Sequence, residues 1–213
     1  IKMTLSNLRI NIDRLVASIE DLAEIGAIDG GGVCRMALSN EDRQGRDLVV
    51  GWMNELGLDV SIDQFGNVIG IREGLESGNP VMTGSHIDTV ASGGRYDGNL
   101  GVLAGLEVIA TLNEAEITTR KPIGVGFFTN EEGSRFAPDM MGSGVHQGAF
   151  DVKSMLDVVD IDGARVGDEL EKIGYAGETL TGEFRADSFV ELHIEQGPIL
   201  ELEDYEIGAV EGV

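Results

Sequence analysis

The sequence predicts an α/β fold, a mixed, mainly parallel sheet flanked by helices. Three short apolar runs each end in polar residues, which is typical of buried strands in such sheets. A strongly apolar helical pattern lies between the first two runs, as it does in a strand–helix–strand crossover. The N-terminal region has the spacing of amphipathic helices. The 213 residues are enough for one hydrophobic core, so we expect one α/β domain.

Two helices are expected before the first strand. Leucine and isoleucine recur at spacings of three and four over residues 8–25, with charged residues between them, which predicts an amphipathic helix. Ser39 and Asp42 resemble the start of a capping box, so a second helix is expected to begin there and to end at Gly57.

A hairpin and three buried strands are expected next. Residues 58–63 and 67–71 are of β type, and the short turn between them predicts a hairpin. The three buried strands are expected at residues 80–85, 123–129 and 188–192. The remaining patterns predict helices over residues 99–112 and 168–173, and a β-like run over residues 205–213.

Composition narrows the functional classes. The formal net charge of −23 repels phosphate backbones, so nucleic acid is not an expected partner. No apolar run is long enough for a membrane span, and neither end has a signal-peptide pattern. Cys34 is the single cysteine and cannot form an internal disulfide, which favours a cytoplasmic location. The excess of acidic residues fits either adaptation to a high-salt habitat or a solvated surface that keeps the protein monodisperse. We favour the second explanation.

Side chains that can bind metal follow each predicted buried strand, where ligands of α/β sheets gather. The strands are followed by His86 and Asp88 in GSHIDTV, by Glu131 and Glu132 in FFTNEEGSRF, and by His193 and Glu195 in LHIEQGP. Asp97 lies in GGRYDGNLGV, just before the apolar helix. Imidazoles and carboxylates without thiols are typical of a catalytic site for Zn, Mn, Co or Ni.

Each candidate also has an ordinary structural explanation. A lone histidine after a strand is more often a hydrogen-bonded polar residue than a ligand. In HxD, however, the two side chains point the same way, so Asp88 can accept a hydrogen bond from His86 and select the metal-binding tautomer. Asp97 alone would be a turn or cap residue, and adjacent acids such as Glu131 and Glu132 are usually solvated surface residues.

Three residues are given no role in the site. His146 has no acidic neighbour in the sequence, and we interpret it as structural. Cys34 is interpreted as a small packing residue. Glu195 is left unassigned.

Taken in order, GSHIDTV, GGRYDGNLGV, TNEEGSRF and LHIEQGP resemble the motifs of the amidase, hydantoinase and carbamoylase family of dinuclear-zinc hydrolases. The similarity spans most of the chain. This family includes N-carbamoyl-L-amino-acid hydrolases, β-ureidopropionases and allantoate amidohydrolases. HIEQGP favours it over the peptidase branches of the same superfamily. The resemblance implies a zinc-exopeptidase-like catalytic domain.

The resemblance also implies a role for each candidate. The implied metal ligands are His86, Asp97, Glu132 and His193, with Asp97 bridging two ions. Glu131 would be the general base, Asp88 would orient His86, and Gln196 would lie in the substrate pocket. Two divalent ions per full-length subunit, Zn or else Mn, Co or Ni, would activate water to hydrolyse an N-carbamoyl-L-amino acid or a related ureido compound such as allantoate. The carbamoyl group would leave as CO2 and ammonia.

The family pattern further predicts that residues 1–213 form the N-terminal portion of the catalytic domain. A lid and dimerisation domain and a C-terminal catalytic portion would then be absent from this chain. No histidine follows His193, so the second metal would keep only Asp97 and Glu132. We therefore expect weak metal binding and little turnover from this chain alone, and a homodimer for the full-length protein.

Three other functions stay open on the sequence. A metallo-aminopeptidase or dipeptidase of the same superfamily would use the same cluster. A non-catalytic binding domain on this scaffold would have no use for the base Glu131. An acidic cation-binding module would require the ordered motifs to be coincidental. Assays of the full-length protein on N-carbamoyl amino acids, allantoate and dipeptides distinguish the enzymes.

Overall fold

The computed structural model describes residues 7–211. Its centre is a sheet in the order β1-β2-β4-β3-β5. The strands are β1 (Asp59–Ile62), β2 (Val68–Arg72), β3 (Val81–Ser85), β4 (Ile123–Phe127) and β5 (Ser188–Val190). β2 is antiparallel to β1 and β4, whereas β3 is parallel to β4 and β5. The mixed sheet and the hairpin predicted from the sequence are both confirmed.

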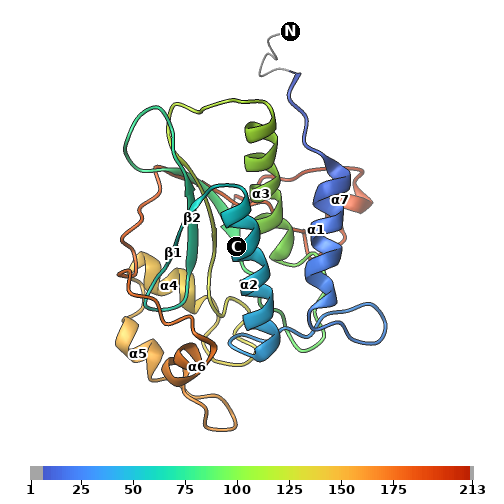
Figure 1. Ribbon diagram of the computed structural model, residues 1–213. Helices are drawn as coiled ribbons and strands as arrows, with labels where there is room; N and C mark the ends of the chain where they lie inside the picture. The colour runs from blue at the N-terminus through green and yellow to red at the C-terminus, as the bar shows by residue number, and fades with distance from the viewer. Residues whose placement is uncertain (1–6, 212–213) are drawn as a thin grey trace.

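Three long helices cover one face of this sheet (Figure 1). They are α1 (Ile12–Glu24), α2 (Asn40–Glu55) and α3 (Asn99–Glu114). α1 begins later than predicted because Asn11 caps it, its side chain accepting a hydrogen bond from the Arg14 N–H. Ser39 caps α2 as predicted, accepting from the Asp42 N–H.

α3 forms the crossover between the parallel strands β3 and β4. It packs on both strands and on α1. Val102, Leu103 and Ile109 are almost completely buried, which explains why the helix is apolar on nearly every face. The parallel pairing brings the carboxyl ends of β3, β4 and β5 to one edge of the sheet.

Four short helices lie between residue 141 and the end of the described part at residue 211. They are α4 (Met141–Gln147), α5 (Val152–Leu156), α6 (Val166–Ile173) and α7 (Ile199–Leu202). Only α6 was predicted, since the others are too short to show a repeating helical pattern. α4, α5 and α6 gather at the lower left of Figure 1.

The β-like run predicted for residues 205–213 is wrong for residues 205–211, which form no strand. Their apolar side chains Tyr205, Ile207 and Val210 are exposed, so no buried face fixes a strand there. Residues 212–213 lie outside the described part. Among residues 7–211, no helix has the length and apolar character that a bilayer crossing demands.

Candidate metal centre

Three ligand atoms from separate segments converge at the carboxyl edge of the parallel strands. His86 follows β3, His193 follows β5, and Asp97 lies just before α3. One ligand atom from each lies within 4.8 Å of the other two. Asp97 Oδ1 is 3.3 Å from His193 Nε2 and 3.9 Å from His86 Nε2. Residues that are remote in the sequence are thus brought together as a group.

Backbone carbonyls hold both imidazoles with Nε2 free. His86 Nδ1 lies 2.9 Å from the carbonyl oxygen of Asp88, and His193 Nδ1 lies 2.9 Å from that of Ile194. Because a carbonyl oxygen only accepts, Nδ1 carries the proton of each neutral ring, and Nε2 of the neutral ring keeps its lone pair. This is the tautomer that binds a metal through Nε2.

The two oxygens of Asp97 have different surroundings. Oδ2 accepts a hydrogen bond of 2.7 Å from Gln196 Nε2, whereas Oδ1 is buried and has no hydrogen-bond partner among the described residues. A buried anionic oxygen beside two nitrogen lone pairs is costly unless a positive charge lies between them. Ligand atoms around a tetrahedral zinc ion are roughly 3.4 Å apart. The three residues therefore fit a divalent cation.

Asp88 supports the site differently from the expectation. Its Oδ1 is 3.9 Å from His86 Nδ1, so the backbone carbonyl rather than the carboxylate holds the ring. The carboxylate instead accepts from the backbone N–H groups of Glu131 at 3.2 Å and Glu132 at 3.3 Å. Burial raises the pKa of Asp88 to about 6, although the positive charge of His86 opposes the rise. Asp88 thus joins the β3 loop to the β4 loop.

The two glutamates of the β4 loop lie differently. Glu131 Oε2 is 3.3 Å from His86 Nε2, and its side chain is 33% exposed, so the carboxylate reaches the centre from the solvent side. Glu132 is not part of the converging group of three. Burial raises the pKa of Glu132; His86 opposes this rise, whereas the negative charge of Asp97 adds to it. A role for Glu132 at a second metal stays a prediction.

The neighbouring carboxylates determine the protonation of His86. Burial lowers the pKa of its imidazole, but the negative charges of Asp88 and Glu131 outweigh that effect, so the pKa is raised overall. In the absence of metal the cluster therefore favours a proton on His86. A divalent ion and this proton compete for the same nitrogen.

A cavity of about 260 Å³ lies beside Glu131. Its other lining residues are Ser85, Phe128, Met140, Ser143, Gln147, Phe189 and Glu191. Ser85 Oγ donates a hydrogen bond of 2.5 Å to Glu191, which joins the ends of β3 and β5 at the cavity wall. This volume lies just below the usual range for ligand sites, so the cavity admits only a small molecule beside Glu131.

Arg35 is a supporting residue that the sequence analysis missed. Its side chain is fully buried. It donates to the carbonyl of Ile87 at 2.8 Å and to Asn99 Oδ1 at 3.0 Å, and so joins the segments that carry His86 and Asp97. Two further hydrogen bonds reach carbonyls at the end of α1. The only signal in the sequence is a single arginine inside the apolar run VCRMAL.

Comparison with known proteins shows which family the chain is similar to. The family model described as peptidase family M20/M25/M40 matches residues 82–211. The N-carbamoyl-L-amino-acid amidohydrolase of Rhizobium meliloti is 43% identical, over 96% of this chain and 49% of its own length. The allantoate amidohydrolase of Bacillus subtilis is 36% identical, over 92% of this chain and 48% of its own length.

Solved structures agree as well. A hydantoinase/carbamoylase family amidase from Burkholderia vietnamiensis has a TM-score of 0.92 and 48% identity, covering 94% of this chain and 49% of that one. The chain spans about half the length of the relatives it matches. The resemblance drawn from the motifs is confirmed. Because the family model covers more than half of the sequence, the chain belongs to peptidase family M20/M25/M40.

Proposed function

We propose that the complete protein is a metal-dependent amidohydrolase that cleaves a C–N bond of N-carbamoyl-L-amino acids or related ureido compounds such as allantoate. One observation carries the proposal. The Nε2 lone pairs of His86 and His193 converge on the unpartnered Oδ1 of Asp97, as ligands of a catalytic cation do. The names of the amidohydrolase relatives support the substrate class. The chain covers about half the length of each relative, which fits a portion of a longer catalytic domain. Its assignment to the N-terminal portion rests on the order of the sequence motifs.

Glu131 is the proposed general base. Its carboxylate lies 3.3 Å from His86 Nε2, beside the ligand group, where it can take a proton from the attacking water and deliver it to the leaving nitrogen. Bound divalent ions lower the pKa of water and polarise the scissile carbonyl. Asp88 fixes the backbone of Glu131, and the cavity beside Glu131 offers space for the substrate.

A second ion is proposed between Asp97 and Glu132. Asp97 Oδ2 accepts a hydrogen bond from Gln196, so Asp97 would hold a second ion only if Gln196 released that oxygen. The amide of Gln196 would then be available to contact substrate, which is the role predicted for it. Zn, Mn, Co and Ni all suit such nitrogen and oxygen ligands.

The test is an assay of the complete protein on N-carbamoyl-L-amino acids, allantoate and dipeptides, measuring ammonia and amine release. We expect activity on one of the first two classes and its loss with a chelator. Glu131→Gln should lower kcat by about 10²–10⁴ while the metal content stays unchanged. Glu203→Gln, an exposed acid near α7, is the matched control. Cleavage of dipeptides alone, or full activity of Glu131→Gln, would contradict the proposal.

Metal binding by the 213-residue chain is measured separately by competition with a chelating dye. We expect weak binding that His193→Ala abolishes, because the second ion has too few ligands here. Two tightly held ions per chain would show this expectation to be wrong.

We also propose that the complete protein is cytoplasmic and forms a homodimer. The single cysteine is compatible with a reducing compartment. Sedimentation of the complete protein measures its oligomeric state, and a monomer at all concentrations would contradict the dimer.

A further inference from the structure

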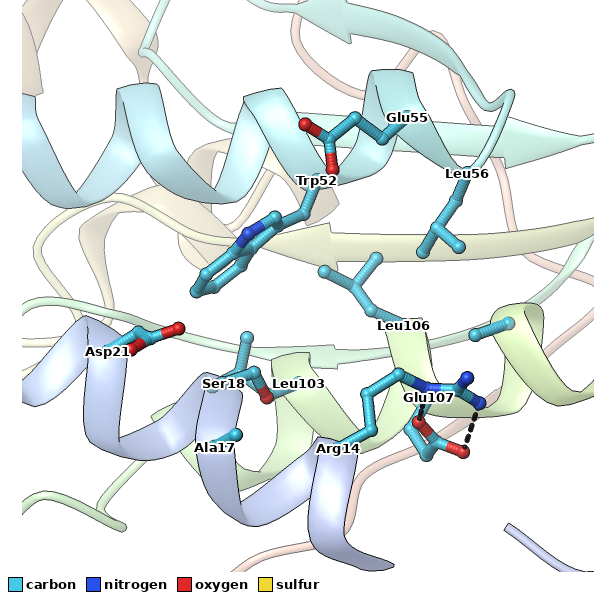
Figure 2. A pocket seen from close by; sticks show the side chains of 11 residues that line it. Arg14, Ala17, Ser18, Asp21, Trp52, Glu55, Leu56, Leu103, Leu106 and Glu107 are labelled. Carbon is cyan, nitrogen blue, oxygen red and sulfur yellow. Dashed lines mark hydrogen bonds and ion pairs between the residues drawn. The ribbon is translucent and has the colours of Figure 1, made fainter. Parts of the chain in front are cut away.

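A second cavity lies among the helices that cover the sheet. Its volume is about 310 Å³, and residues of α1, α2 and α3 line it (Figure 2). It shares no lining residue with the cavity beside Glu131 and contains none of the metal-centre residues. Its floor is apolar and includes Leu56, Leu103, Leu106 and Ala110. Nothing in the proposed reaction uses this cavity.

Trp52 forms one wall of this helical cavity. Figure 2 shows its indole projecting from α2 into the space between α2 and α1. The side chain is only partly buried, so a ligand can reach the ring. The face of an indole attracts cations.

Two carboxylates lie on the Trp52 side of the cavity. Asp21 comes from α1 and Glu55 from α2 (Figure 2). Within residues 7–211, neither side chain has a hydrogen bond or an ion pair. Their negative charge is therefore available to a ligand.

The opposite end of the cavity is already neutralised. Arg14 donates to Glu107 at 2.7 Å and also pairs with Glu114. Its guanidinium is therefore engaged and offers little to an anionic ligand. The charges lining the cavity are one positive, Arg14, and three negative, Asp21, Glu55 and Glu107.

We propose that this cavity binds a small organic cation, an ammonium or guanidinium group on an apolar body. The cation lies against the Trp52 ring, with the carboxylates of Asp21 and Glu55 on either side of that ring (Figure 2), and the apolar body covers Leu103 and Leu106. Neutral and anionic molecules of the same shape lack the electrostatic part of this interaction. The volume is at the small end of the range for ligand sites, which favours a compact amine.

The sequence provides a direct probe of this cavity, because Trp52 is the only tryptophan. Its fluorescence is followed while 2-phenylethylamine, 2-phenylethanol or phenylacetate is added to the chain in the presence of a chelator. We expect a saturable change with the amine, weaker binding of the alcohol, and no binding of the acid. No saturable change with the amine, or equal binding of all three, would overturn the proposal.

Charge variants separate a specific site from the general acidity of the surface. Asp21→Asn and Glu55→Gln should each weaken amine binding by about fivefold. Glu20→Gln removes the same charge from an exposed position of α1 outside the cavity, and binding should be unchanged. Equal weakening by all three variants would assign the effect to the net charge of −23 and overturn the proposal. The fluorescence titration is run without bound metal. Its result therefore tests the amine site independently of the proposed hydrolase activity.

Discussion

Arg35 places a buried positive charge directly behind the metal centre. Burial lowers the pKa of its guanidinium to about 10, while the negative charges of Asp42 and Asp88 oppose the fall, so it stays charged near neutral pH. Its hydrogen bonds to Ile87 and Asn99 fix the two segments from which His86 and Asp97 project. Arg35 is thus a positioning residue that touches no ligand atom itself.

The variant Arg35→Gln should destabilise the chain by about 3–5 kcal/mol, because it leaves several buried carbonyls without donors. Metal affinity of the folded protein should fall as well, and Arg35→Lys should recover part of it. Urea unfolding and chelator competition measure the two effects. The control Arg165→Gln, in a pair with Asp157 that is largely exposed, should cost at most about 1 kcal/mol. A similar cost for both variants would refute the role of Arg35.

His146 should make stability dependent on pH. Burial lowers its pKa from the ordinary value of 6.5, and the nearby charge of Asp63 only partly opposes this. The unfolded chain therefore takes up a proton below 6.5 before the folded protein does. The contribution of His146 to the free energy of unfolding is fully present above pH 6.5, and it is lost as the pH falls toward the pKa of the folded state. Urea unfolding of the wild type and of His146→Gln across this window should show a steeper loss for the wild type, and parallel curves would contradict the prediction.

At the scale of elements, the start of α3 packs directly against the imidazole of His86 in the metal centre. Gly98 precedes the helix with a φ of 65°, a conformation that favours glycine. A Cβ at this position would lie 2.4 Å from His86 Nε2. The helix can approach the imidazole only because this residue has no side chain.

Gly98→Ala should therefore lower metal affinity by about 10–100-fold, because the His86 ring must move. The left-handed backbone should add about 1–2 kcal/mol of destabilisation. Gly51→Ala in the middle of α2 is the matched control, since a Cβ there meets nothing within 4 Å. It should raise stability by up to about 1 kcal/mol and leave metal affinity unchanged. Unaltered metal binding by Gly98→Ala would show that the close approach is unimportant.

The elements that the sequence predicted are those with a repeating pattern. β3, β4 and α3 are apolar because most of their side chains are buried, and Ser39 marks the start of α2 through its hydrogen bond. β5 is a strand as predicted, but Ser188, Phe189 and Val190 are exposed, so the expectation of a buried strand there is wrong. α4, α5 and α7 were missed because they are short and are held by contacts rather than by their own periodicity.

The candidate site was predicted to a similar degree. Position after a strand identified His86 and His193, and the motifs added Asp97. The partner of His86 Nδ1 was not predictable, because sequence cannot distinguish the carboxylate of Asp88 from its backbone carbonyl. Arg35 acts through hydrogen bonds to distant segments, which no local pattern records.

At the scale of the whole molecule, charge opposes folding. The sequence has 38 acidic and 15 basic residues, a net charge of −23. Repulsion between these carboxylates is greater in the compact state than in the expanded unfolded chain. Salt screens exposed charges over a length of about 10 Å at 0.1 M, so it should relieve this repulsion.

The unfolding midpoint of the metal-free chain should therefore rise as NaCl increases, with most of the rise complete by about 0.3 M, where the screening length is short. Replacing sodium by tetramethylammonium at equal ionic strength should give the same rise, because screening does not require a specific cation site. Near pH 5, where part of the acidic groups are protonated, the rise should be smaller because less repulsion remains to be screened. Thermal unfolding followed by circular dichroism measures all three series. An unfolding midpoint that is independent of salt at neutral pH would contradict this prediction. It would show that repulsion between the acidic groups does not destabilise the folded state.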